Sequence, residues 1–375
     1  MKNTVLEALL PIPPAELVAT RWEAVSSFLA ERELDPGDLG AFMLDRVGPG
    51  ELLLTSSPVH GLANPTSDLD FIRVQEAGIS GPRISTKIFE RGHHLEVVSF
   101  SAAEVKRNLD ALTELAGASP AEVVAGFRGW DKRYEPRRKQ TERIVNGVTL
   151  DGRAPYLSAL PALALIWSRA ALQTAAEQTA HLCLAEAAGE RRGRVGYAYN
   201  VLLHLMDCVL SLHGDVYTTR KWYVLRWVRF ARRNLWHDDR YRALAAGIED
   251  ARTTVSDALR PDHRSPLAGT YAGLLTDAAR ATGAAASITV AVTPADDAEY
   301  HPFLPGSGMV SAGDRSLLVT GDWPPPAAPV PLADLASLDA RTAATALRAI
   351  RAGVATARIA YEPFDDKSDD KEGTA

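Results

Sequence analysis

The feature that most constrains this chain is a loop between two short apolar runs. The loop reads S-P-V-H-G-L-A-N-P-T-S-D-L-D from Ser57 to Asp70. It follows an apolar run at residues 52–54 and leads into another at residues 71–74, and both have the length and composition of strands. Side chains alternate along a strand, so Asp68 and Asp70 are predicted to project from the same face. Two carboxylates at one point repel each other unless a cation lies between them, and oxygen ligands favour Mg²⁺ or Mn²⁺.

A third carboxylate, Glu96, is expected on a neighbouring strand. Residues 84–90 and 93–100 read as the two strands of a hairpin, separated by Arg91-Gly92. Alternation places Glu96 on the same face as His94. A lone Glu in a strand is most often a solvated outward residue. The aspartate pair upstream makes a role in the same site the stronger interpretation.

These residues resemble the DNA polymerase β-like nucleotidyltransferase superfamily. Its small-molecule-modifying members carry a Gly-Ser turn, a downstream Gly and a Ser-Asp-x-Asp strand. The matching residues here are Ser56-Ser57, Gly61 and Ser67-Asp68-Leu69-Asp70, and Ser57 precedes Asp68 by 11 positions, the interval usual in that family. Ser56 stands where the family has Gly. Because Gly allows positive φ and close approach to a phosphate, this departure bears on nucleotide affinity.

The resemblance implies a Mg²⁺-dependent (or Mn²⁺-dependent) transferase that moves a nucleoside monophosphate, with AMP from ATP expected, onto a hydroxyl of a small molecule. The acceptor would be an aminoglycoside-like antibiotic or a natural-product intermediate, and pyrophosphate would be released. The general base would be Glu96 itself or an acidic residue of the following helices such as Asp207. The expected catalytic and metal-binding residues are Asp68, Asp70 and Glu96. The residues expected to bind the nucleotide are Ser56, Ser57, Gly61, Ser67 and Lys221.

Two other segments admit two interpretations each. His60 and Asn64 lie in the same loop, where they either contact the nucleotide or form an ordinary solvated turn. Residues 216–223 read V-Y-T-T-R-K-W-Y and resemble the Lys-Trp segment of the family's helical bundle, so Lys221 would reach the triphosphate. The nearby arginines at 220, 226 and 229 either extend this positive charge or belong to an exposed basic helix.

The predicted fold class is α/β (α+β), with several parts in the chain. A nucleotidyltransferase domain with a small mixed sheet is expected over residues 1–152, followed by a helical bundle over 153–285. A small C-terminal α+β element over 286–361 and a disordered acidic tail over 362–375 complete the prediction. Helices are predicted from Pro14 to Leu29, near 39–47 and over 335–359, and strands over 287–292 and 316–320. A loop is predicted over 301–309 and a stiff connector over 324–331. Turns around a short extended piece are predicted within 141–152.

Composition agrees with an enzyme of more than one domain. The chain has 375 residues, of which 46% are hydrophobic and 23% charged. This length is more than one hydrophobic core ordinarily accommodates. No signal-peptide pattern and no run of about 18 apolar residues is visible, so neither secretion nor a membrane span is expected. Cys183 and Cys208 lack metal-ligand spacing and are predicted to be buried thiols of a cytoplasmic protein.

Other functions remain as alternatives. The formal net charge of −6 disfavours nucleic acid as acceptor, and the basic run at 137–139 is typical of a solvated face. A protein-adenylylating transferase is disfavoured by the roughly 220 residues that follow the motif-bearing part, since smaller members of that kind are little more than the catalytic domain. Ser56 in place of Gly, and a C-terminal region that resembles no known family, motivate the second alternative, a non-catalytic scaffold or binding protein with the same fold.

Overall fold

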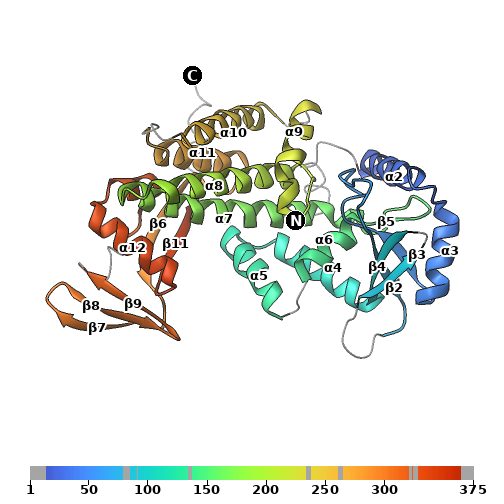
Figure 1. Cartoon of the computed structure of the whole chain (residues 1–375), viewed down its shortest axis with the longest axis horizontal. Helices are drawn as coiled ribbons and strands as arrows, with labels where there is room; N and C mark the ends of the chain where they lie inside the picture. The colour runs from blue at the N-terminus through green and yellow to red at the C-terminus, as the bar shows by residue number, and fades with distance from the viewer. Residues whose placement is uncertain are drawn as a thin grey trace, which may run out of the picture. The chain divides into compact units, whose positions relative to one another are not determined.

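The chain divides into two compact units (Figure 1). The computed structural model describes residues 14–78, 85–90, 92–133, 137–233, 238–260, 265–320, 323 and 328–364. Unit 1 comprises residues 1–168 and 210–237, and unit 2 comprises residues 169–209 and 238–375. Residues of the helical stretch predicted over 153–285 therefore contribute to both units. The functional limits at 152, 285 and 361 stay predictions.

Unit 1 is built around one mixed sheet. The strand order is β3-β4-β2-β1-β5, in which β2 and β4 are parallel and the other neighbours antiparallel. The elements of unit 1 are α2 (Pro14–Ala30), α3 (Pro36–Val47), β1 (Glu51–Leu54), β2 (Leu69–Gln75), β3 (Thr86–Glu90), β4 (His93–Ser101), α4 (Ala102–Ala116), α5 (Pro120–Arg133), α6 (Arg137–Asn146), β5 (Val148–Thr149), the 3₁₀ turns η1 (Leu157–Ala159) and η2 (Arg220–Trp222), and α9 (Tyr223–Arg233).

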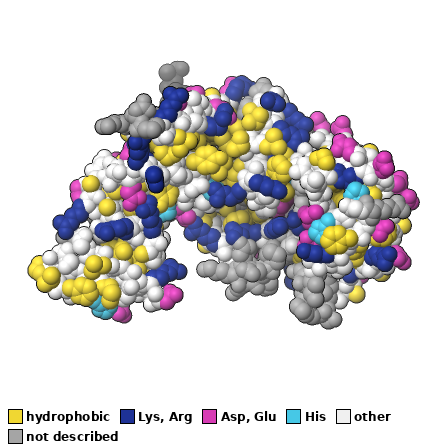
Figure 2. Space-filling model, viewed as in Figure 1, with side chains coloured by type: hydrophobic (Ala, Val, Ile, Leu, Met, Phe, Trp, Pro, Cys, Tyr) yellow, Lys and Arg dark blue, Asp and Glu magenta, His cyan; other side chains and the backbone are white. Residues whose placement is uncertain are grey.

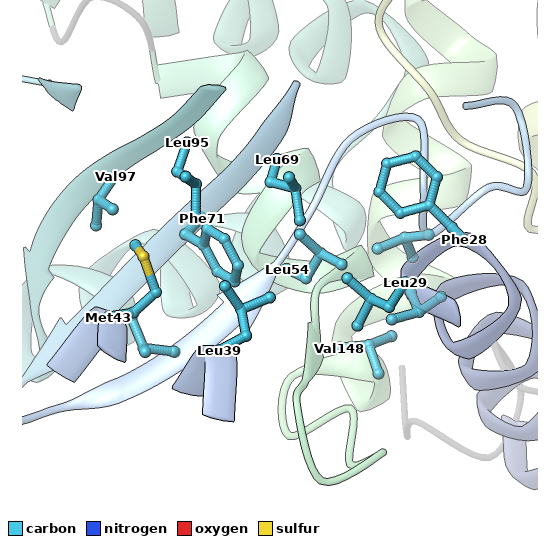
Figure 3. Close-up of a cluster of buried hydrophobic side chains, with 13 residues drawn as sticks. Phe28, Leu29, Leu39, Met43, Leu54, Leu69, Phe71, Leu95, Val97 and Val148 are labelled. Atoms are coloured by element: carbon cyan, nitrogen blue, oxygen red, sulfur yellow. The ribbon is translucent and has the colours of Figure 1, made fainter. Parts of the chain in front are cut away.

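Two hydrophobic clusters cover the two faces of this sheet. On one face, Leu54, Leu69 and Phe71 pack against side chains of α2 and α3, including Leu29 and Met43 (Figure 3). On the other face, side chains of β1, β2 and β4 pack with residues of α4 and α6. Strand alternation sends successive residues to opposite clusters, which is why β2 is apolar at most of its positions.

Local signals explain where two helices of unit 1 begin. Asp35 caps α3 by accepting a hydrogen bond from the Asp38 N–H, with Pro36 in the first turn. Ser101 and Glu104 form a reciprocal capping box that starts α4 directly after β4. The sheet and the helix on its face are therefore joined by a single residue.

Unit 2 combines helices with two three-stranded sheets, ordered β10-β6-β11 and β7-β8-β9. Helices α7 and α8 each have residues in both units. The elements are α7 (Leu160–Ala187), α8 (Arg191–Leu212), α10 (Asp239–Asp257), α11 (Ala268–Ala281), β6 (Ser287–Pro294), β7 (Glu299–Leu304), β8 (Ser307–Ala312), β9 (Arg315–Thr320), β10 (Val330–Pro331), the 3₁₀ turn η3 (Leu332–Ser337), α12 (Ala340–Ala352) and β11 (Ala355–Glu362). Figure 2 shows hydrophobic side chains gathered over β7, β8 and β9.

Three sequence-based element predictions are wrong. The loop predicted over 301–309 is a hairpin of β7 and β8, which turns at Gly306 with φ +72°. The helix predicted over 335–359 ends at Gly353, whose φ of +73° caps α12, and the chain returns as β11 alongside β6. Residues 141–146, predicted to be turn and extended chain, end α6. Glycines at positive φ set the hairpin turn and the helix end, and pairing with neighbouring strands forms the rest of β8 and β11.

One helix of the described chain is long and apolar enough to cross a bilayer by length and composition. It is α8, with a mean hydropathy of 1.3 over its most apolar window, of which 61% is buried within the protein. That burial is typical of a core helix. Residues 324–327 of the predicted connector and residues 365–375 of the predicted tail lie outside the described residues.

Candidate active site

The turn after β1 positions the first candidate residues. Both the N–H and the hydroxyl of Thr55 donate to the carbonyl of Asp70, at 2.9 and 3.0 Å, which ties the end of β1 to the start of β2. The next residue, Ser56, has φ +66°, the conformation that Gly would take most easily. A non-Gly residue pays about 1–2 kcal/mol there. The turn expected from the family resemblance is thus formed with Ser, and backbone strain is stored beside the carboxylates.

The rest of the loop is held by its own hydrogen bonds. The Leu62 N–H donates to the Ser57 carbonyl at 2.9 Å, and Gly61 takes φ +60°. The Ser67 hydroxyl is used inside the turn, because it accepts from the Asn64 N–H and donates to Asn64 Oδ1 at 3.0 and 3.1 Å. Asn64 is therefore a turn former, one of its two predicted interpretations. Ser57 is half-buried at the start of the turn.

The structure brings the three predicted carboxylates to one face of the sheet. Asp70 and Glu96 are direct neighbours on the parallel strands β2 and β4, so their side chains share a face. Asp68 immediately precedes β2 and lies 3.1 Å from Nδ1 of His94, which is two residues before Glu96 on the same face. Lys87 of β3 is the register partner of Glu96 on its other side.

Each carboxylate already has a partner in unit 1. Arg143 of α6 donates from Nη2 to Asp70 Oδ2 at 3.1 Å, and both side chains are largely buried. Ser85 donates to Glu96 Oε1 at 2.7 Å. Together with the Asp68–His94 pair, these contacts give each carboxylate of the acidic face a hydrogen-bonding or ion-pair partner from unit 1 itself.

The carboxylates match a divalent metal in kind but not in arrangement. Oxygen-only donors suit Mg²⁺ or Mn²⁺. Among the described residues, however, no group of three or more His, Cys, Asp or Glu side chains is placed to hold one ion. The reason is visible in the contacts, since Asp70 is turned towards Arg143 and Asp68 towards His94.

A buried polar network that sequence reasoning missed lies beside this face. His60 is sandwiched between Glu142 and Asp215, at 3.5 and 3.7 Å, and stacks on the Tyr217 ring with centroids 4.6 Å apart. Neither predicted interpretation of His60 anticipated this buried position. Asp215 also accepts from Nε of Arg226 at 3.1 Å. The network reaches the carboxylates through α6, because Glu142 is followed by Arg143.

Burial and charge shift the pKa values of this network. Burial by itself raises the pKa of Asp215, but Arg226 and His60 outweigh it and hold that pKa far below its usual range. Burial lowers the pKa of Arg21 to about 10, against the opposing effect of Asp215 and Glu142. Burial also raises the pKa of Tyr217. The only sequence signal for the network was that Glu142 and Asn146 are spaced by one helical turn. In the structure Asn146 Nδ2 donates to Glu142 Oε1 at 2.9 Å.

Other predicted residues fall in different surroundings. Lys221 is exposed in η2, with Nζ 5.0 Å from the Trp222 ring centroid. Arg226 is buried in the network, and Arg229 donates to the Gly61 carbonyl at 2.7 Å, so these two are not an exposed basic helix face. Asp207 is buried in α8, in the part of that helix that belongs to unit 2.

Comparison with known sequences assigns the chain to a family. A model described as "Family of unknown function (DUF6001)" matches residues 12–361. The chain belongs to this family. A search of curated proteins gives no significant match. Among solved structures, the chain is similar to a nucleotidyltransferase-like protein from Exiguobacterium sibiricum 255-15, with 13% identity over 62% of this chain and 68% of that one. The TM-score of 0.26 is too low to establish a shared fold.

Proposed function

We propose that this member of the family is a nucleotidyltransferase that moves a nucleoside monophosphate, with AMP from ATP as the expected case, onto a hydroxyl of a small molecule. The observation that carries the proposal is the direct pairing of Asp70 with Glu96, next to the positive-φ turn at Ser56. Two neighbouring carboxylates beside a strained turn suit a nucleotide when a cation offsets the negative charge of both.

Each group has a role in this proposal. Asp68, Asp70 and Glu96 would have to leave their contacts with His94, Arg143 and Ser85 to hold a divalent cation together. Such a cation would neutralise phosphate charge and acidify an acceptor hydroxyl. Ser57 offers its hydroxyl and the backbone of the turn to the phosphates. Arg143 orients Asp70 through its hydrogen bond to Oδ2.

Labelled product formation tests this proposal. Protein, Mg²⁺ and each α-labelled ribonucleoside triphosphate are incubated with hydroxyl-bearing acceptors such as aminoglycosides, and the label on the acceptor is measured. We expect transfer that falls about a hundredfold or more in Asp70→Asn and in Glu96→Gln. Asp45→Asn, which changes an exposed carboxylate of α3, is the matched control and should retain the wild-type rate.

A non-catalytic binding role is the second candidate. The observation that favours it is that Asp70 pairs with Arg143 and Asp68 with His94, so these two carboxylates have partners without a bound cation. A binding protein of this kind should bind nucleotide or partner equally well after Asp70→Asn. Loss of metal-dependent nucleotide binding in that variant would reject the second candidate.

A further inference from the structure

A pocket in unit 1 lies apart from the carboxylates. It has a volume of about 460 Å³ and is formed by α2, residues 58–63, residues 213–215 and α9. We call it the α2–α9 pocket. This volume is within the range of small-molecule sites. Neither the three carboxylates nor Ser57 is among its lining residues.

One part of the lining of the α2–α9 pocket, here called its floor, is apolar and buried. Phe28, Val59, Leu62 and Phe230 line it, and each is at most 6% exposed. Such a floor can hold an apolar body by excluding water from it. The buried charges of the network also border the pocket, but they are already engaged by one another.

One wall carries positive charge from α9. Arg226, Arg229 and Arg233 recur at helical spacing on the face that lines the pocket. Arg226 is committed to Asp215, whereas the bond that Arg229 makes within the described residues is from Nη1 to the Gly61 carbonyl. Arg233 is exposed and forms no ion pair with any residue that the structure describes. Two guanidinium groups are therefore available to an anion.

Negative charge at the pocket comes from α2 and from the residue that follows it. Glu23 of α2 and Glu31, directly after the last residue of that helix, are exposed and line the pocket. Within the described part of the chain, neither carboxylate forms an ion pair with the arginines of α9. Opposite charges thus line one pocket without neutralising each other across it.

We propose that the α2–α9 pocket binds a small zwitterion with an apolar middle. Its carboxylate or phosphate end pairs with Arg229 and Arg233, and its amine end pairs with Glu23 or Glu31. The middle packs on the apolar floor that includes Phe230. The charged residues of this pocket are not those of the carboxylate face, and of the expected nucleotide-binding residues only Gly61 lines it.

Calorimetric titration of the full chain with matched probes tests the proposal. O-phosphotyramine and 4-(2-aminoethyl)benzoate are zwitterions with an aromatic middle, whereas phenyl phosphate and tyramine each carry one of the two charges. We expect at least one zwitterion to bind about tenfold more tightly than either singly charged probe. Whichever zwitterion binds more tightly identifies phosphate or carboxylate as the preferred anion.

Variants locate the binding. Arg229→Ala and Arg233→Ala should each weaken the zwitterion about tenfold while leaving tyramine unchanged, and Glu31→Gln should weaken tyramine. Arg232→Ala, which changes the exposed neighbour outside the pocket, is the control and should bind as wild type. Because Arg233 is exposed, its removal leaves folding intact. Equal binding of zwitterion and single charges, or loss of binding only in Asp68→Asn/Asp70→Asn, would overturn the proposal.

Discussion

Replacing Asp215 by Asn is expected to destabilise unit 1 strongly. Asp215 pairs with Arg226, whose side chain is 2% exposed, and with His60, whose side chain is 7% exposed. Removing one partner of a buried pair costs about 3–5 kcal/mol, because the other charge stays buried without compensation. Asp215 is itself 27% exposed, and Arg226 still donates to the Tyr217 carbonyl. We therefore expect the lower end, a loss of about 3 kcal/mol in the free energy of unfolding.

The loss should depend on pH in one direction. The pKa of Asp215 is depressed in the folded protein, so its stabilisation is fully present above its unfolded pKa and is lost as pH falls towards the folded pKa. The difference between wild type and Asp215→Asn should be constant from pH 7 to about pH 5. With an unfolded pKa of about 3.9, it should shrink by about 1 kcal/mol by pH 3.

Urea unfolding followed by tryptophan fluorescence measures this effect. Every tryptophan except Trp323 lies in unit 1, so the signal reports on that unit. Asp110→Asn is the matched control: Asp110 pairs with Lys106 on the surface, and its loss should cost at most about 0.5 kcal/mol. A loss below about 1 kcal/mol for Asp215→Asn, or a difference that grows as pH falls, would refute the reasoning.

Three further outcomes are expected. Ser56→Gly should raise the free energy of unfolding by about 1 kcal/mol, measured by urea unfolding, because it relieves the positive φ; a less stable variant would contradict this. Arg143→Met should strengthen binding of Mn²⁺, measured by electron paramagnetic resonance, because it removes the cation that pairs with Asp70; unchanged or weaker binding would argue against a metal at this face. Cys183 and Cys208 are buried, and burial raises the pKa of Cys183 to about 12, so neither should react with a thiol reagent at pH 8 until the protein is unfolded.

Short-range patterns predicted the sheet of unit 1 well. The apolar runs at 52–54 and 71–74 are β1 and β2, and the hairpin around Glu96 is β3 and β4. Alternation and chain adjacency determine these elements, because a one-residue shift would expose the core face. The hairpin at 299–312 was missed, although β8 has an alternating burial pattern, because its partner β7 is exposed along its whole length.

The candidate site was predictable only where its residues lie close in sequence. Asp68 and Asp70 share one motif, and Glu96 follows from the next hairpin. The arginine that pairs with Asp70 is 73 positions away, and nothing in its own segment marks it as a partner. The network around His60 likewise joins residues from three distant segments. Such pairings depend on how helices pack on the sheet, which local propensity does not determine.

Binding of nucleotides tests the central claim most directly. Each of the four ribonucleoside triphosphates is titrated by calorimetry, with and without Mg²⁺, into wild type, Asp68→Asn/Asp70→Asn and the control Asp45→Asn. The account predicts that one triphosphate binds in a Mg²⁺-dependent way to wild type and control, and that the double variant loses this binding. Absence of binding by all four, or equal binding by the double variant, would contradict it.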